Sequence, residues 1–186
     1  MLWFAPFWQY SPGLVFPLLT ESHSSLLREL PGSVVGDLLA EWEEYDARVF
    51  QEVDTVGSAG FISLWEKDVV GFASWDPRGM PAVGAIGHNC ILPEFRGRGF
   101  GQHQVKEILR RFGQGGAAKA RVLTDEHPFY GPAVRMYERC GFQVVERLPG
   151  TFFEGYSTLA MDLEFPSRSR ASAPDQTPSG ASEEGE

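Results

Sequence analysis

The chain has 186 residues, of which 42% are hydrophobic and 22% charged, so it is long enough for one globular domain with a filled core. A formal net charge of −9 argues against general binding to nucleic acid or to an anionic membrane. No apolar run in the sequence is long enough to span a membrane. Two cysteines, Cys90 and Cys140, make neither a metal cluster nor a disulfide framework. We therefore expect a cytoplasmic protein without a metal.

The first third of the chain predicts one strand and two helices. The opening segment MLWFAPFWQY is apolar, but it lacks a basic start and is interrupted by a proline, so it is a poor signal peptide. Residues 13–19 (GLVFPLL) form a short apolar run and predict the first strand. Thr20 and Ser33 are placed to cap the two helices that follow, over residues 21–30 and 34–50.

The rest of the chain alternates strands with helices. Two β-rich runs, residues 61–66 and 69–75, read as a hairpin. In two later segments apolar residues recur at helical spacing, which predicts amphipathic helices. The later elements expected are strands over residues 82–92, 120–124, 142–148 and 156–165, and helices around residues 105–112 and 133–140.

This order of elements predicts a single α/β domain with a mixed sheet, which we place at residues 1–165. Residues 166–186 contain no large apolar side chain. Such a segment cannot bury enough surface to offset the entropy lost on ordering, so it reads as a disordered tail.

Residues 93–102 (PEFRGRGFGQ) combine three glycines with two arginines between a strand and a helix. Glycines at such a junction let backbone N–H groups approach an anion, and the helix N-terminus adds partial positive charge. A structural turn is the alternative. The spacing alone does not decide, because residues 110–115 repeat the pattern where a helix ends. A P-loop would need Gly-Lys-Ser/Thr, and a dinucleotide fingerprint would need G-x-G-x-x-G; neither is present.

Residues 132–145 (PAVRMYERCGFQVV) predict a short helix that carries Tyr137 and then turns into a strand. Together with the glycine loop, this segment resembles the GNAT superfamily of acyl-CoA-dependent N-acyltransferases. Residues 91–101 resemble that family's pyrophosphate loop and residues 133–142 its second motif, and the resemblance covers about residues 60–165. It implies an α/β fold with a mixed, mainly antiparallel central sheet of six to seven strands, flanked by about four helices.

The resemblance also implies where acetyl-CoA, the expected cosubstrate, binds. The backbone N–H groups of the glycine loop would cradle its pyrophosphate. The end of the strand over residues 82–92 would pair with the pantetheine arm like an extra strand, since a splayed strand leaves backbone groups unpaired. The cofactor-binding residues implied are Asn89, Cys90, Ile91, Arg96, Gly97, Arg98, Gly99, Phe100, Gly101 and Gln102.

The reaction implied is transfer of an acetyl group from acetyl-CoA to a primary amine, by direct attack through a tetrahedral intermediate. Tyr137 is the expected acid for the CoA thiolate; a half-buried aromatic on the apolar face of a helix is the structural alternative. His88, whose ordinary pKa suits the task, is the first candidate base and Glu126 the second. Asp76 is better explained by the turn sequence Asp-Pro-Arg-Gly, and Cys90 by burial, than by catalysis.

Two other functions remain open from the sequence. A non-catalytic acyl-CoA-binding or sensor module would keep the glycine loop without needing Tyr137. A protein-interaction module built on the aromatic N-terminus would not bind CoA at all. The acidic residues from Glu41 to Asp46 read either as a solvated helix face or as an attraction for a cationic amine. The expected partner is a small-molecule or peptide amine, and a homodimer through the C-terminal strands is left open.

Overall fold

The structure is a computed structural model that describes residues 1–150, 153 and 155–166. Apart from Pro166, the predicted tail lies outside the described residues, and the domain boundary at residue 165 stays a prediction. Within the described ranges, no helix combines the length and the apolar character needed to cross a membrane.

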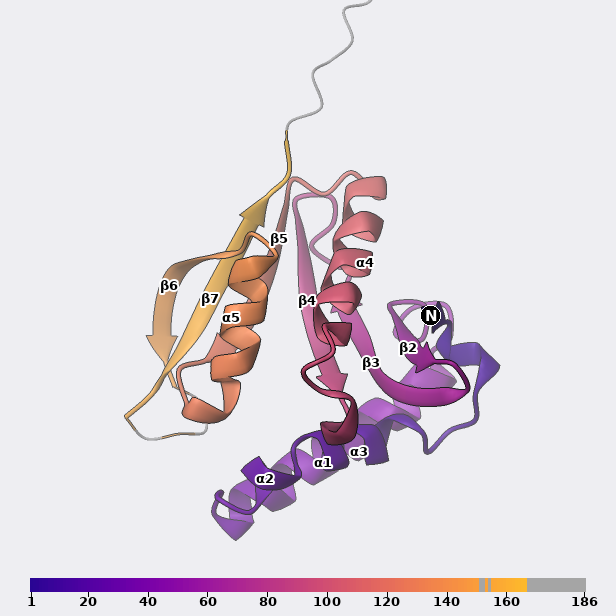
Figure 1. The fold of residues 1–186 in the computed structure, drawn as a ribbon, viewed down its shortest axis with the longest axis vertical. Helices are drawn as coiled ribbons and strands as arrows, with labels where there is room; N and C mark the ends of the chain where they lie inside the picture. The colour runs from indigo at the N-terminus through magenta and orange to yellow at the C-terminus, as the bar shows by residue number, and fades with distance from the viewer. Residues whose placement is uncertain (151–152, 154, 167–186) are drawn as a thin grey trace, which may run out of the picture.

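Seven strands of the described residues form one sheet in the order β1-β2-β3-β4-β5-β7-β6 (Figure 1). Every neighbouring pair is antiparallel except β4 and β5, which are parallel. This arrangement confirms the expected mixed, mainly antiparallel sheet. The strands are β1 (Leu2–Ala5), β2 (Gly60–Trp65), β3 (Asp68–Asp76), β4 (Val83–Ile91), β5 (Lys119–Asp125), β6 (Gln143–Pro149) and β7 (Ser157–Glu164).

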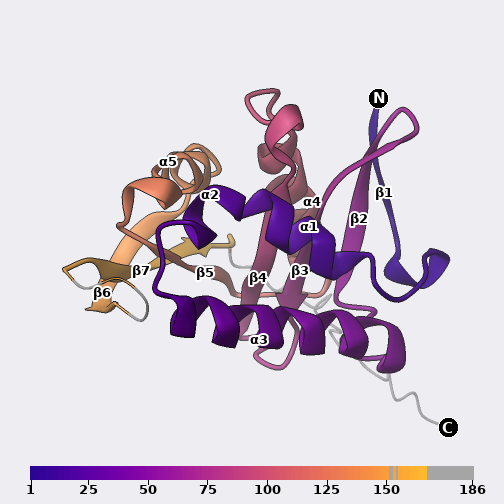
Figure 2. The same ribbon diagram turned by 90° about the horizontal axis from the view of Figure 1, so that it is seen from below.

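Helices cover both faces of the sheet, α4 and α5 on one face and α1 with α3 on the other (Figures 1 and 2). The α-helices are α1 (Val15–Ser22), α2 (Ser24–Leu27), α3 (Gly32–Gln51), α4 (Phe100–Gln114) and α5 (Gly131–Arg139). Short 3₁₀ turns are η1 (Phe7–Gln9), η2 (Pro93–Phe95) and η3 (Pro128–Tyr130). The helices α4 and α5 follow β4 and β5, so the two strands at the parallel junction each lead into a helix.

Strand alternation gives the sheet a hydrophobic core on each face. The neighbouring β2 residues Phe61 and Ile62 are both fully buried, yet they belong to different cores. Phe61 packs in the core that contains Phe112 of α4, and Ile62 in the core that contains Trp42 of α3. A sheet packed on both faces has a strongly specified register, which fixes the position of β4 and of the loop that follows it.

Residues 13–19 enter a helix, α1, and the strand predicted there is wrong. The helix has no cap from its own segment, and Asp46 of α3 supplies one. The Asp46 carboxylate accepts hydrogen bonds from the backbone N–H groups of Gly13 (2.7 Å), Val15 (2.6 Å) and Phe16 (3.1 Å). Pro17 lies in the first turn, where a helical N–H has no intrahelical partner to lose. The first strand is instead β1, in the apolar opening segment.

The other predicted elements are present with shifted ends. The hairpin of β2 and β3 is confirmed, and its turn places Glu66 at a φ of 59°. The helix predicted over residues 21–30 is divided between the end of α1 and the four-residue α2. The long helix α3 begins at Gly32, with Pro31 and not Ser33 at the N-cap position.

Candidate active site

The strands β4 and β5 separate partway along their length (Figure 1). Their parallel pairing ends where Ile86 lies opposite Val122, although both strands continue beyond this point. Directly after this last pair, β4 contains one more residue than the facing segment of β3, a bulge that bends a strand and increases its twist. In the described part of the chain, the predicted residues Asn89, Cys90 and Ile91 therefore have no neighbouring strand on the β5 side.

The glycine loop after β4 presents a row of unpaired backbone donors. Gly97 and Gly99 have φ values of 75° and 80°, a left-handed conformation that favours glycine, and Gly99 is the N-cap of α4. Among the described residues, no acceptor bonds the N–H groups of residues 97–102; the first bonded N–H is that of His103, 3.1 Å from Gly99 O. A Cβ added at Gly97 would meet nothing within 4 Å, and one at Gly99 only the His103 ring at 4.0 Å. The donors therefore border open space at the positive end of a helix dipole.

The repeat of the glycine pattern at residues 110–115 lies at the opposite end of the same helix. Gly113 is inside the last turn of α4, and Gly115 is its C-cap, with its N–H bonded to Arg111 O at 2.9 Å. A helix C-terminus exposes carbonyl groups and carries partial negative charge, so this copy of the pattern does not make an anion site.

A cleft of about 610 Å³ connects the glycine loop with the end of β4, a volume typical of ligand sites. Its walls come from the α1–α2 junction, β4, the glycine loop, η3 and α5. Nine of the ten predicted cofactor-binding residues line it, and the exception is Arg98. The Arg98 guanidinium lies over the Phe95 ring, 5.4 Å from its centroid, and donates to Glu94 O at 3.3 Å. The side chain of Arg98 is thus turned toward Phe95 and Glu94 and does not line the cleft.

The Arg96 side chain holds two walls of the cleft together. Its Nε donates to Ile91 O at 3.0 Å, and its Nη2 donates to Ser22 O at the end of α1. Two other arginines, Arg135 and Arg139, line the cleft from successive turns of α5. They were not among the residues predicted from the sequence, although their spacing of four residues on the predicted helix of the second motif places both on one face.

Tyr137 of α5 is only 5% exposed and is not one of the residues that line the cleft. Its hydroxyl oxygen accepts a long hydrogen bond of 3.5 Å from the Nδ2 of Asn89, which lines the cleft. Burial raises the pKa of Tyr137 to about 12, so the hydroxyl is protonated over the physiological range. Because the Asn89 amide occupies an acceptor position of the oxygen, the hydroxyl proton remains available for another acceptor.

The structure does not bring the two predicted bases into the cleft. His88 packs on the α3 side of the sheet, with its ring centroid 4.6 Å from that of Tyr45. Burial, together with the nearby His23, lowers the pKa of His88 to about 4, so the premise that its pKa suits a base at neutral pH does not hold. Glu126 accepts a hydrogen bond from Arg147 Nε at 2.9 Å, which lowers the pKa of Glu126 and keeps its carboxylate occupied.

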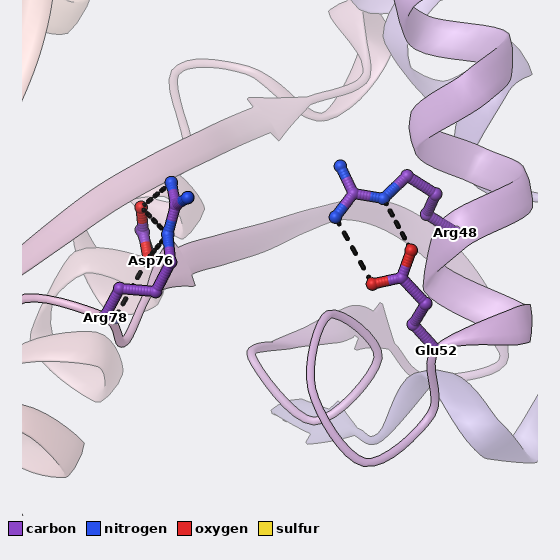
Figure 3. Close-up of polar contacts among 4 residues, drawn as sticks. All are labelled: Arg48, Glu52, Asp76 and Arg78. Carbon is purple, nitrogen blue, oxygen red and sulfur yellow. Dashed lines mark hydrogen bonds and ion pairs between the residues drawn. The ribbon is translucent and has the colours of Figure 1, made fainter.

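Two groups of charged residues that the sequence singled out are structural. Asp76 accepts from the backbone N–H of Arg78 at 2.9 Å and pairs with its guanidinium, which confirms the turn (Figure 3). Figure 3 also shows the bidentate pair of Arg48 and Glu52 that closes the last turn of α3. Within the acidic cluster of α3, Asp46 is buried at the α1 N-terminus, while the glutamates Glu41, Glu43 and Glu44 are exposed. The cluster is therefore a cap joined to a solvated face.

His23, at the junction of α1 and α2, lines the cleft and was not among the predicted residues. Its ring centroid lies 5.2 Å from that of Trp42 and 5.6 Å from that of Phe129. Burial lowers the pKa of His23, a hydrogen bond to Leu19 opposes that shift, and the charge of Arg96 adds to it. No local sequence pattern marks this residue, which lies within the helix predicted over residues 21–30 and between α1 and α2 in the structure.

The residues present fit an acyl-CoA. Six consecutive unpaired N–H groups beside left-handed glycines match an anion as extended as a pyrophosphate. At the start of α1, the Asp46 carboxylate is the anion that accepts the corresponding N–H groups. The unpaired edge of β4 can meet the amide groups of a pantetheine arm. Arg135 and Arg139 add positive charge to the cleft of a chain whose net charge is −9.

Comparison with known proteins gives a family and a fold. The model of the Acetyltransferase (GNAT) family matches residues 21–142, whereas no curated protein matches the chain in sequence. A candidate acetyltransferase of the GNAT family from Desulfovibrio desulfuricans superposes with a TM-score of 0.67 at 16% identity, over 88% of this chain and 98% of that chain. An aminoglycoside 6'-acetyltransferase type Ii superposes with a TM-score of 0.62 at 16% identity, over 90% of this chain and 99% of that chain. The ribosomal-protein-S18-alanine N-acetyltransferase from Escherichia coli gives 0.53 at 13%, over 60% and 72%.

Proposed function

The chain belongs to the acetyltransferase (GNAT) family, and on that premise we propose that it transfers an acetyl group from acetyl-CoA to a primary amine. One observation carries the proposal: the unpaired N–H groups of residues 97–102 and the unpaired end of β4 border the same cleft. Two proteins of the same fold are named for an aminoglycoside and for an alanine of a ribosomal protein, so the fold alone does not choose the acceptor.

The energetic problem of the reaction is the acceptor nitrogen. An alkylamine has a pKa near 10.4, so presenting it as a neutral nucleophile at pH 7 costs about 4.6 kcal/mol. The thioester carbonyl also develops negative charge, which a backbone N–H at the end of β4 would stabilise. The protein therefore has to orient the amine, accept one of its protons and stabilise the leaving thiolate.

Tyr137 serves the leaving thiolate as a hydrogen-bond donor. Its pKa of about 12 keeps the proton on the hydroxyl, which a donor requires. An ordinary thiol has a pKa near 8.5, so full transfer of that proton to the thiolate would be uphill by roughly 3.5 units, or about 5 kcal/mol. A short hydrogen bond from Tyr137, with the final proton taken from water, stabilises the thiolate without that cost.

The burial of Cys90 favours direct transfer over an acyl-cysteine intermediate. The thiol is 5% exposed, and its Sγ lies 3.9 Å from Leu18 O on the side of the sheet that faces α1. Burial raises the pKa of Cys90 to about 11, so the thiolate needed for attack is scarce at neutral pH. The backbone of Cys90, and not its side chain, then belongs to the cofactor site.

Calorimetric titration with acetyl-CoA, followed by thiol release in the presence of a library of primary amines, tests the proposal. We expect saturable binding at one site and release of CoA that depends on an amine. Absence of acetyl-CoA binding would remove the proposed function. Binding with no release for any amine would favour a non-catalytic acyl-CoA-binding module.

The variant Tyr137→Phe separates an enzyme from that module. It removes the hydroxyl while keeping the aromatic packing against Phe142. We expect the affinity for acetyl-CoA to be unchanged and kcat to fall by about 10²-fold, since one donor to the leaving group is lost. Tyr10→Phe, at the end of η1, is the control and should retain wild-type turnover. Equal turnover in Tyr137→Phe and in the control would contradict the assignment.

A further inference from the structure

The proposed reaction leaves the proton of the acceptor amine without a destination, and among the described residues that line the cleft His23 is suited to receive it. His23 lines the cleft together with Asn89 and Ile91 of β4. The bond of Arg96 to Ser22 O and to Ile91 O fixes the His23 segment against the end of the strand where the pantetheine arm is expected. The His23 ring is thus held in the wall of the cleft in which acetyl-CoA and the amine are expected to react.

The hydrogen bonds of His23 determine which ring nitrogen carries the proton. Nδ1 lies 2.9 Å from Leu19 O, and a carbonyl oxygen can only accept, so we assign the ring proton to Nδ1. The Ser22 hydroxyl agrees with this assignment, because it donates to the same carbonyl at 3.1 Å and can accept from Nδ1 at 3.0 Å. The neutral ring therefore carries its proton on Nδ1 and an unshared electron pair on Nε2.

That Nε2 atom is free and accessible. Among the described residues it has no hydrogen-bond partner. In the described ranges, Gln104 Oε1 is the one fully buried side-chain nitrogen or oxygen that has no hydrogen-bond partner. Because His23 Nε2 also has no partner, it must be at least partly exposed to solvent. Trp42 and Phe129 contact the ring and hold it in place. The positive charge of Arg96 opposes protonation of His23, and His23 in turn contributes to the lowered pKa of the neighbouring His88.

We propose that His23 is the general base of the reaction, with Nε2 accepting a proton from the acceptor nitrogen. This inference rests on the proposed acetyl transfer. The amine lone pair forms the N–C bond, the carbonyl oxygen takes the displaced electron pair, and the nitrogen becomes positively charged. His23 removes one proton from that nitrogen; the carbonyl then re-forms and the C–S bond breaks, its electron pair leaving on the thiolate. The imidazolium afterwards returns its proton to water, which restores the neutral base.

The neutral state needed for this role is favoured by the site. Burial lowers the pKa of His23 below the ordinary value of about 6.5, so the ring is unprotonated at neutral pH. A base of this strength does not deprotonate a free alkylammonium ion. It does suit the positively charged nitrogen formed after attack on the carbonyl, which is far more acidic.

One substitution of His23, with a control at the adjacent residue, distinguishes a base from a structural residue. An asparagine places its Nδ2 donor where His Nδ1 stands, so His23→Asn can keep the bond to Leu19 O while it removes Nε2 together with the ring contacts to Trp42 and Phe129. A general base predicts that kcat for thiol release falls by about 10²–10³-fold in His23→Asn, with an affinity for acetyl-CoA within about 3-fold of wild type. Ser24→Ala, on the adjacent residue, is the control and should keep wild-type values. Wild-type turnover in His23→Asn would overturn the proposal.

The probes are tyramine, spermidine and the dipeptide alanylglycine. If none is acetylated, the slow hydrolysis of acetyl-CoA replaces them, since attacking water must lose a proton to the same base. Failure of the wild-type protein to bind acetyl-CoA in calorimetry would refute the proposed function itself. Binding by the wild type with equal turnover in wild type and His23→Asn would refute only the role of His23.

A second measurement is independent of any acceptor. Long-range ¹H–¹⁵N spectra of protein labelled in histidine, assigned with His23→Asn, report the protonation of each ring nitrogen. We expect His23 at pH 7 to carry its proton on Nδ1 and to have a bare Nε2. A ring that is charged at pH 7, or that carries its proton on Nε2, would overturn the proposal.

Discussion

The helices α1 and α4 both begin without a cap from their own segments, yet the first N–H groups of α1 are hydrogen-bonded within the protein and those of α4 are not. At α1 the carboxylate of Asp46, brought in by α3, accepts three backbone hydrogen bonds and is buried in doing so. At α4 the N–H groups of residues 97–102 bond no acceptor among the described residues and face a cleft. The two helix ends pose the same electrostatic problem, and the fold solves it internally for only one of them.

This difference shows what distinguishes a structural helix start from a binding site. Buried donors in folded proteins are nearly always paired, as at α1, whereas the unpaired donors at α4 begin in an exposed loop and are left to solvent or to a ligand. An internal carboxylate satisfies α1, which shows that an anion is the right partner at such an end. At α4 the left-handed Gly97 and Gly99 keep side chains away and leave room for a larger anion.

The largest effect is expected from a substitution that fills the space in front of the unpaired N–H groups at the start of α4. Gly99→Val places a β-branched side chain at a φ of 80°, which costs about 1–2 kcal/mol, and fills the space before the donors. With the lost charge-assisted hydrogen bonds, we expect the Kd for acetyl-CoA in calorimetry to rise by about 10²–10³-fold. Gly113→Ala, in the last turn of α4, is the control, because its Cβ would meet only Phe165 at 3.6 Å. A Kd for Gly99→Val close to that of the control would refute the cradle.

Removing the carboxylate that caps α1 should lower the stability of the protein and leave ligand binding unchanged. Asp46→Ala removes the acceptor of three backbone N–H groups at α1, two of them only partly buried. We expect the free energy of unfolding in urea to fall by about 2–3 kcal/mol. Asp37→Ala, at an exposed position of the same helix α3, should change it by less than about 0.5 kcal/mol. Similar stabilities for the two variants would show that Asp46 does not cap α1.

A smaller effect is expected from adding a negatively charged side chain at the start of α4. Gln102→Glu adds a carboxylate to the first turn of α4, where it complements the helix dipole but repels a bound anion. We expect acetyl-CoA to bind about 10-fold more weakly, with the loss reduced at high salt. Gln114→Glu, at the other end of α4, should leave the Kd unchanged. Weakening by both variants alike would mean that net charge, and not the helix start, controls binding.

Much of the fold could be predicted from residues that interact locally. The hairpin of β2 and β3, the helix α4 and the strand pair at the C-terminus follow from alternation and helical spacing. The segment of residues 13–19 could not be assigned in this way, because its cap comes from Asp46, 31 residues from Val15. Without that carboxylate in view, a short apolar run with a proline looks like a strand.

The residues on the glycine-loop side of the cleft could be predicted from the sequence, whereas His23, the proposed base, could not. Glycines between a strand and a helix leave a trace in the sequence, and Tyr137 stands in a recognisable motif. The role proposed for His23 depends on the contacts of Nδ1 with Leu19 O and Ser22 Oγ and on the place of His23 in the cleft wall. His88 looked suitable by type and position, but packing against Tyr45 and Phe72 buries it and lowers its pKa.

The central claim is that the open N–H groups at the start of α4 hold the pyrophosphate of acetyl-CoA. Glycine amides occupy their own region of a ¹H–¹⁵N correlation spectrum, so a titration with acetyl-CoA can compare the two ends of the helix directly. We predict that the amides of Gly97, Gly99 and Gly101 shift and exchange more slowly with solvent on binding, while those of Gly115 and Gly116 do not. Equal changes at both ends, or none at the three loop glycines with acetyl-CoA bound, would contradict the account.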